Sequence, residues 1–276
     1  LGNEMWEGTG GYSAAYKTAQ DNLVKWAQAA DTTRPVTTGD NKLKGEEEGS
    51  ITLANGLQEA SGIHGMNYAS GAEYDKIHKK YSEWPLYGSE TASAVNSRGI
   101  YKGMTSQHNY GNHDLTSYDT SAVGWGATAS SAWYEVIKRD FLAGEYVWTG
   151  FDYLGEPSPY DTDAWPNHSS MFGIIDLASL PKDRYYLYRS VWNKDAETLH
   201  ILPHWTWPGR EGEVTPVFVY TNYPTAELFI NGKRYGKQSK NNSSLKNRYR
   251  LMWMDAVYEP GEVKVVAYNK DGKAVA

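Results

Sequence analysis

The chain has 276 residues, with 27 Lys and Arg against 33 Asp and Glu, which gives a formal net charge of −6. This mildly acidic balance does not suit a nucleic-acid partner, which requires a basic surface. The absence of cysteine excludes disulfides, thiolate metal sites, iron–sulfur clusters and a cysteine nucleophile. No apolar run is long enough to span a bilayer, so no membrane partner is predicted.

The first 195 or so residues alternate between helical and strand-like patterns. In chain order we expect a helix at 13–30, a strand at 36–38, a solvated acidic loop at 40–50, a strand at 63–68, a helix at 71–82 and a strand at 85–88. A polar connection at 93–126 is then followed by a helix at 129–141, a strand at 146–151, a second polar loop at 155–170 and a helix at 182–193. This alternation predicts a parallel sheet or barrel with crossover connections.

From residue 199 onward the pattern changes to strand-like runs alone, at 199–205, 217–220, 227–230, 248–254 and 263–268. Turn signals separate them, notably Asn231-Gly232, Pro260-Gly261 and Asp271-Gly272. This segment is typical of a small antiparallel β-sandwich. The sequence therefore predicts two domains, at 1–198 and 199–276.

Few motifs that carry chemistry are present. The chain has no G-x-S-x-G, P-loop, dinucleotide-binding or H-E-x-x-H motif, and its seven histidines show no ligand spacing that predicts a metal site. Glu4 and Glu90 each follow a short predicted strand, with two more strands between them. Because the strands of a parallel barrel end at one rim, two glutamates there suit an acid and a nucleophile for glycoside cleavage. The alternative for each glutamate is a helix cap or an ion pair.

Five separated blocks resemble family 2 glycoside hydrolases, the β-galactosidase and β-glucuronidase group. LGNEMWEG resembles the general acid/base motif of that family, and YGSETAS resembles its nucleophile motif. The other blocks, in family order, are EYVWTGFDYLGEPSPY, SSMFGIIDLASLPKDRYYLYRSVW and ELFINGK…PGEVKVVAY. The similarity covers essentially the whole chain.

The resemblance implies a role for each matched residue. Glu4 is expected to be the general acid and base, and Glu90 the nucleophile. Asn3 is expected to bind the sugar 2-hydroxyl, and Tyr68 to donate a hydrogen bond to Glu90. Trp148 is expected to form the floor of the subsite as a stacking platform, with a barrel-core position as its alternative. Further pocket-lining residues are expected to be Trp6, Asn67, His108, His113, Asp152, Trp165 and His168.

The implied fold is the C-terminal half of a (β/α)8 TIM barrel followed by an all-β immunoglobulin-like sandwich. On this view the chain is a fragment whose partner is the missing N-terminal half of the same enzyme. The half-barrel alone exposes open sheet edges, and we expect it to be inactive or poorly folded. Oligomerisation stays open.

The implied activity is that of a retaining exo-β-glycosidase that hydrolyses terminal non-reducing β-D-galactosides in oligosaccharides or glycans through a covalent glycosyl-enzyme. Ser170-Met171-Phe172 replaces the Asn-x-Lys motif expected of β-glucuronidases, which disfavours a uronic acid. Ser93 stands where some large β-galactosidases have a histidine, which leaves their hydroxyl contacts and metal arrangement open here. No cofactor is predicted, and a divalent metal, as in some family members, stays open.

Three other functions fit the same sequence, and one of them is a structural half-barrel scaffold, which a stable, monodisperse 276-residue chain would support. A carbohydrate-binding module is suggested by the terminal sandwich and by the 22 Tyr and 11 Trp, although binding alone does not require the two glutamates. A family 2 hydrolase for another neutral β-sugar is the remaining alternative.

Overall fold

A computed structural model describes residues 2–7, 10–101, 115–154 and 169–276. Its backbone contacts divide the chain into two compact units. The first consists of residues 1–93, 124–127 and 131–148, and the second of residues 94–123, 128–130 and 149–276. The domain boundary predicted at residue 198 stays a prediction.

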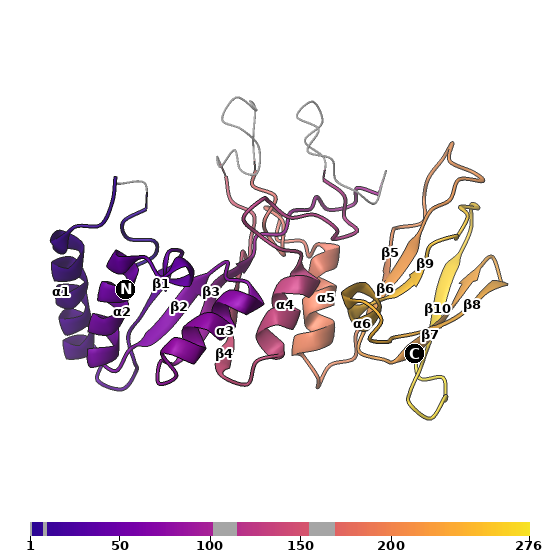
Figure 1. Cartoon of the computed structure of the whole chain (residues 1–276). Coiled ribbons are helices and arrows are strands. Elements are labelled where there is room, and N and C mark those ends of the chain that lie inside the picture. The colour runs from indigo at the N-terminus through magenta and orange to yellow at the C-terminus, as the bar shows by residue number, and fades with distance from the viewer. Residues whose placement is uncertain (1, 8–9, 102–114, 155–168) are drawn as a thin grey trace. The chain divides into compact units, whose positions relative to one another are not determined.

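The first unit contains a four-stranded parallel sheet in the order β1-β2-β3-β4 (Figure 1). The strands are β1 (Thr37–Asp40), β2 (Ile63–Asn67), β3 (Leu86–Ala92) and β4 (Leu142–Trp148). Asn3 pairs in parallel with Gly39 on the free edge of β1. The predicted parallel sheet is confirmed, and its strands all end at one edge.

The helices are α1 (Ala14–Ala30), the 3-10 helix η1 (Leu43–Gly45), α2 (Glu48–Glu59), α3 (Gly71–Lys80) and α4 (Ala129–Ile137). Apolar side chains from η1, α2 and α3 share one buried cluster with β2 and β3; they include Leu43, Ala54, Met66, Tyr74, Ile77, Trp84 and Leu86. Burial of each large apolar side chain contributes about 1.5–3 kcal/mol, so this layer holds the sheet in place.

Several predicted elements differ from the structure, and three of them bear on the site. The segment 40–50 was expected to be a solvated loop but contains η1 and the start of α2. Its first turn forms because an Asp40 carboxylate oxygen accepts from the N–H groups of Lys42 (2.6 Å) and Leu43 (2.8 Å). β4 begins at Leu142, four residues before the predicted strand, and β3 extends past Glu90.

The second unit contains α5 (Asp183–Trp192), α6 (Leu245–Tyr249) and six strands. These are β5 (Leu199–Leu202), β6 (Val217–Thr221), β7 (Thr225–Ile230), β8 (Lys233–Ser239), β9 (Leu251–Trp253) and β10 (Val263–Tyr268). They form two antiparallel sheets, in the orders β5-β6-β9 and β10-β7-β8. Side chains of both sheets meet in one core, which includes Val217, Val219, Leu228, Ile230, Trp253 and Val265.

The expected Asn231-Gly232 turn joins β7 to β8, and both residues have positive φ (49° and 77°), as a tight hairpin turn requires. β8 and α6 were not expected from the sequence. Within the described parts of the chain, no helix is long and apolar enough to cross a membrane.

Candidate active site

Asn3 and Glu4 lie at the edge of the sheet because the chain start runs beside β1. The Glu4 N–H donates to the Gly39 carbonyl (3.0 Å), and the Gly39 N–H donates to the Gly2 carbonyl (3.1 Å). Gly39 has no side chain at this point, and a Cβ atom there would lie 2.5 Å from Asn3 Oδ1. The absence of a side chain at Gly39 therefore lets Asn3 approach the strand closely.

Glu90 lies within β3, opposite Asn67 at the end of β2. The pairing is irregular between Met66 and Asn67, and the next residue, Tyr68, has φ 52°. The Tyr68 N–H donates to the Glu90 carbonyl (2.7 Å), and the Tyr68 hydroxyl donates to Glu90 Oε2 (2.7 Å). Backbone and side chain of Tyr68 therefore fix the same glutamate.

Asn67 fixes the other glutamate. Its fully buried side chain donates from Nδ2 to Asn3 Oδ1 (2.9 Å) and to Glu4 Oε1 (2.8 Å). Its Oδ1 accepts from the Ser89 hydroxyl (2.6 Å), which determines the orientation of the amide. Consecutive residues at the end of β2 thus hold Glu4 and Glu90.

The electrostatics of Glu90 reflect opposing effects. Burial raises the pKa of the Glu90 carboxyl above its ordinary value of 4.5, the hydrogen bond from Tyr68 lowers this pKa, and the charge of Glu4 raises it. Hydrogen bonds from Asn3 and Asn67 lower it further. Burial and the charge of Glu4 together outweigh the three donors, so the pKa of Glu90 stays above its ordinary value.

Burial also raises the pKa of Tyr68, and a hydrogen bond from Ser93 to the phenol oxygen lowers it. Its hydrogen bond to Glu90 raises the pKa further. The phenol therefore keeps its proton and remains a hydrogen-bond donor to the carboxylate.

Two charged residues at this edge were missed by sequence reasoning. Lys44, in the segment expected to be a solvated loop, donates to Asn41 Oδ1 (2.6 Å) and to the carbonyls of Asn67 (3.0 Å) and Tyr68 (3.2 Å). Burial and the charge of Glu4 raise the pKa of Glu7, which follows in the same block as Glu4. Glu7 could have been found from the sequence, because it lies three residues after Glu4 in the same motif. The sequence contains no feature that distinguishes Lys44 from neighbouring polar residues.

Of the other predicted site residues, Trp148 lies at the same edge of the sheet as the two glutamates, and several others lie outside the described residues. Trp148 is the last residue of β4, half-buried and paired with Ala92 of β3, so it lies at the same edge of the sheet. Trp6 makes an edge contact with the ring of Tyr12 (6.2 Å between centroids). The predictions for His108, His113, Trp165 and His168 lie outside the described residues.

Asp152 belongs to the second unit and is engaged in a buried ion pair. One of its carboxylate oxygens lies 2.6 Å from the Lys182 ammonium, and the other accepts from the Gly173 N–H (2.7 Å). Each oxygen therefore has a protein partner, and the sugar contact expected of Asp152 stays a prediction. Across the described ranges, no group of three or more His, Asp or Glu side chains is arranged to hold a metal ion.

The chain is similar in sequence to one protein family model and to several known proteins. Residues 212–276 match the model of a domain of unknown function, DUF4982. The chain is 37% identical over 267 residues to the beta-galactosidase BoGH2A of Bacteroides ovatus, which covers 92% of this chain and 29% of that protein. It is 36% identical over 161 residues to a putative beta-glucuronidase of Formosa agariphila, covering 58% of this chain and 15% of that protein.

A solved structure shows the same fold. The glycosyl hydrolase family 2 (GH2) member from Bacteroides cellulosilyticus superposes with a TM-score of 0.71 at 25% identity, covering 96% of this chain and 32% of that one. The chain thus spans about a third or less of the length of these three relatives. The sequence blocks, the fold and the long alignment agree: the chain belongs to glycoside hydrolase family 2 and corresponds to a part of its members.

Proposed function

We propose that the protein is a retaining exo-β-glycosidase for terminal β-D-galactosides, with Glu90 as nucleophile and Glu4 as general acid and base. The observation that carries the proposal is that two consecutive residues contact the two glutamates, with Asn67 donating to Glu4 Oε1 and Tyr68 donating to Glu90 Oε2. A binding module requires no such pair, whereas a retaining glycosidase needs two carboxyl groups roughly 5–5.5 Å apart.

In the first step, a carboxylate oxygen of Glu90 attacks the anomeric carbon while the bond to the leaving oxygen breaks. This step requires Glu90 to be ionised, and the hydrogen bond from Tyr68 to Oε2 stabilises that form. The hydrogen bond also holds the carboxylate in one orientation for attack.

Glu4 supplies the proton that the leaving oxygen takes up. Its Oε1 accepts from Asn67, which leaves Oε2 to carry the proton. After the leaving group departs, the ionised Glu4 removes a proton from water, and the hydroxide attacks the glycosyl-enzyme and releases Glu90. Two displacements at one carbon retain the anomeric configuration.

Asn3 and Trp148 complete the proposed sugar site. The Asn3 amide oxygen accepts from Asn67 and its NH₂ group donates to Glu90, which leaves the second N–H of that group as a donor to the sugar 2-hydroxyl. Trp148, at the end of β4, offers an aromatic face for the apolar side of the ring.

The contacts of Lys44 favour a neutral sugar over a uronic acid. A lysine ammonium has three N–H donors, and those of Lys44 are all directed to Asn41, Asn67 and Tyr68. Lys44 therefore has no donor left for a sugar carboxylate. The sequence Ser170-Met171-Phe172 is consistent with this preference.

We further propose that the parallel sheet is the C-terminal half of a (β/α)8 barrel over residues 1–198. The two antiparallel sheets form an immunoglobulin-like domain over residues 199–276. In this arrangement further barrel strands close the sheet and supply the other sugar contacts.

The test is a panel of nitrophenyl β-galactoside, β-glucoside and β-glucuronide with the natural polypeptide that carries this sequence. We expect the galactoside to react fastest, with the β-anomer as first product by NMR, and Glu90→Gln to reduce the rate at least about 10³-fold, or about 4 kcal/mol. Sugar affinity of Glu90→Gln is measured in parallel. A fastest reaction with the glucuronide, or an α-anomer as first product, would contradict the proposal.

A further inference from the structure

β3 contains one more residue than β2 at the point where it carries Glu90. Met66 of β2 pairs with Gly88, whereas the next residue of β2, Asn67, pairs with Glu90, so Ser89 is skipped in this pairing. An extra residue of this kind is a β-bulge, which bends a strand locally and redirects the side chains that follow it. The proposed nucleophile therefore lies directly after a bulge.

The pairing of β3 with β4 contains the same irregularity. Gly88 pairs with Glu145 and Thr91 pairs with Val147, so three steps along β3 correspond to two steps along β4. The extra residue relative to β4 thus lies between Gly88 and Thr91, where the extra residue relative to β2 also lies. Because both neighbours show it, the bulge belongs to β3 itself.

The bulge changes the alternation of side chains along β3. In a regular strand, consecutive side chains point to opposite faces of the sheet. Here two consecutive side chains both reach the proposed site. The Ser89 hydroxyl donates to Asn67 Oδ1 (2.6 Å), and Glu90 Oε2 accepts from the Tyr68 hydroxyl (2.7 Å). The direction of Glu90 therefore depends on the bulge.

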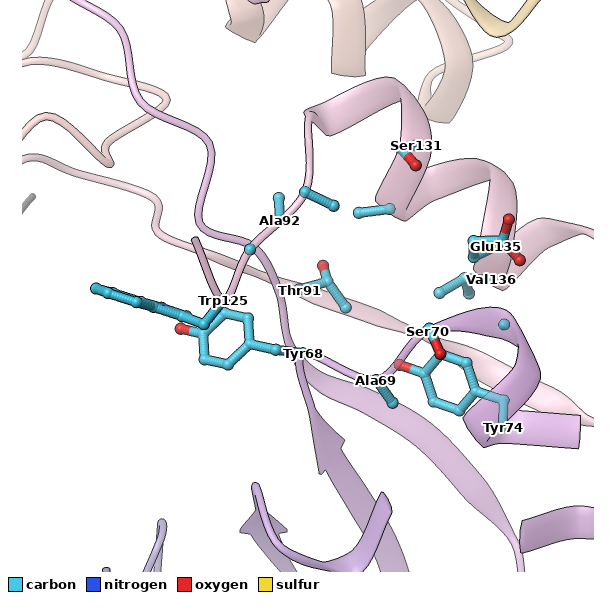
Figure 2. Close-up of a pocket in the computed structure, with 14 residues that line it drawn as sticks. Tyr68, Ala69, Ser70, Tyr74, Thr91, Ala92, Trp125, Ser131, Glu135 and Val136 are labelled. Atoms are coloured by element: carbon cyan, nitrogen blue, oxygen red, sulfur yellow. The ribbon is translucent and has the colours of Figure 1, made fainter. Parts of the chain in front are cut away.

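Thr91, the residue after Glu90, lies on the side of the sheet that faces α3 and α4. A Cβ atom on Gly88 would lie 2.6 Å from Thr91 Cγ2 and 2.8 Å from the Tyr74 hydroxyl oxygen, so Gly88 and Thr91 share one side. Thr91 also borders a cavity of about 320 Å³ whose other walls include Tyr74 of α3 and Glu135 of α4 (Figure 2). Because the cavity leaves space beside Thr91, packing alone does not fix this side chain.

Glu145 of β4 provides the contact that fixes Thr91. The Thr91 hydroxyl donates to Glu145 Oε2 (2.7 Å), with the Tyr146 carbonyl at 3.4 Å as a longer contact on the same strand. Glu145 Oε1 is buried and, within the described residues, has no hydrogen-bond partner. Burial raises the pKa of Glu145 from 4.5 to about 7, although the hydrogen bond from Thr91 acts to lower it. The chain thus keeps a carboxyl that costs stability, which is typical of residues that serve a functional site.

We propose that Glu145 is a positioning residue for Glu90: by accepting from Thr91, it ties β4 to the bulge of β3 and holds Glu90 in the direction of the site. The inference rests on the proposed function, because it gives Glu145 a role in placing the nucleophile. Thr91 transmits the contact, since it follows Glu90 directly in the chain. A displacement of a reacting group by about 1 Å costs on the order of 100-fold in rate, so a lost contact at this distance from the nucleophile is measurable.

The test measures kcat, KM and melting temperature with nitrophenyl β-galactoside and the natural polypeptide that carries this sequence. Thr91→Val removes the hydroxyl and should lower kcat at least about tenfold while KM changes less than about threefold, because substrate binding does not require an aligned nucleophile. Thr91→Ser keeps the hydroxyl and should retain most of kcat. The matched control is Thr37→Val, which removes a hydroxyl of the same sheet that donates to the Ile63 carbonyl (2.6 Å).

Substitutions of Glu145 separate positioning from a purely structural role. Glu145→Met removes the acceptor and should lower kcat at least about tenfold, whereas Glu145→Gln keeps an acceptor oxygen and should retain most of kcat. Because the raised pKa means that ionised Glu145 lowers stability at pH 8, Glu145→Met should melt at or above the wild-type temperature there. The double variant with Thr91→Val should stay within about twofold of the slower single variant, since both substitutions remove one bond.

Values of kcat within about twofold of wild type in Thr91→Val and Glu145→Met, or an equal fall in Thr37→Val, overturn the inference. A double variant whose loss is the product of the two single losses also overturns it, because the two residues then do not act through each other. If Thr91→Val does not fold, the two Glu145 variants decide the question, and equal values of kcat in Glu145→Met and Glu145→Gln overturn the inference.

A hydrogen-exchange arm separates this inference from the proposed function. If the wild type hydrolyses no glycoside, the proposed function fails, and exchange is measured at the Tyr68 N–H, which donates to the Glu90 carbonyl (2.7 Å). Exchange that is at least about tenfold faster in Thr91→Val and Glu145→Met, but not in Thr37→Val, still supports Glu145 as the residue that holds the bulge. Exchange within about twofold of wild type in these variants overturns it.

Discussion

Replacing Tyr68 with phenylalanine removes the hydroxyl that donates to Glu90 and keeps the aromatic ring. A hydrogen bond to a charged group contributes about 1.5–3 kcal/mol. Because Glu90 is half-buried, water replaces part of the lost contact, and we take the lower value. A loss of about 1.5 kcal/mol in the stabilisation of ionised Glu90 should lower kcat/KM at low pH about tenfold.

The direction of the effect follows from which form of Glu90 is stabilised. Burial already raises the pKa of Glu90, and the Tyr68 hydroxyl lowers it because it binds the ionised form. Its loss raises the pKa further, so Glu90 becomes ionised, and able to attack, only at higher pH. The acid limb of kcat/KM should therefore move to higher pH in Tyr68→Phe.

The assay is kcat/KM for nitrophenyl β-galactoside from pH 4 to pH 9, with melting temperatures to check folding. Tyr81→Phe is the matched control, since it removes a hydroxyl at the C-terminal end of α3, where Tyr81 stacks on Trp84. A Tyr68→Phe variant that loses rate at every pH while its acid limb stays in place would refute the argument that Tyr68 stabilises ionised Glu90.

Three other substitutions test neighbouring parts of the site and fold. Gly39→Ala places a Cβ atom 2.5 Å from Asn3 Oδ1, so kcat/KM should fall about 100-fold while circular dichroism shows a folded protein. Lys44→Met removes the donor to the Tyr68 carbonyl and should lower kcat/KM about tenfold together with the melting temperature. Burial raises the pKa of Glu145 from 4.5 to about 7, so this residue lowers stability progressively as the pH rises through that range. Glu145→Gln should raise the free energy of unfolding by about 2 kcal/mol at pH 8 and much less at pH 4 in urea titrations, and equal changes at both values would contradict this.

The helices that the sequence predicted well have both an apolar stripe and a defined start or end. α3 begins at Ser70, whose hydroxyl accepts from the Glu73 N–H while the Glu73 carboxylate accepts from the Ser70 N–H, a capping box visible in the sequence. α1 and α5 likewise begin and end within one residue of their predicted bounds.

The missed elements lack such local signals. α2 contains Gly49 and Gly56, which disfavour a helix, and it forms because Gly49 allows the ring of Tyr12 to approach. β8 is mostly exposed and polar, so no alternation marks it, and it forms because the Asn231-Gly232 turn places it against β7. In both cases the decisive contact comes from another element.

The arrangement of the site could not be predicted from a local pattern either. Neighbouring residues in a strand normally point to opposite faces of a sheet, so the sequence does not predict that two consecutive residues contact two glutamates at the same edge. Asn67, the last residue of β2, and Tyr68, which follows it, can hold two glutamates at one edge only because the register shifts before Asn67 and Tyr68 leaves the strand with φ 52°. Left-handed backbone costs a non-glycine residue roughly 1–2 kcal/mol, and Glu4 (φ 49°) and Ser93 (φ 50°) at the same edge adopt it too. The rest of the fold must offset this strain, which a sequence pattern does not reveal, and the result is a fixed pair of carboxyl groups.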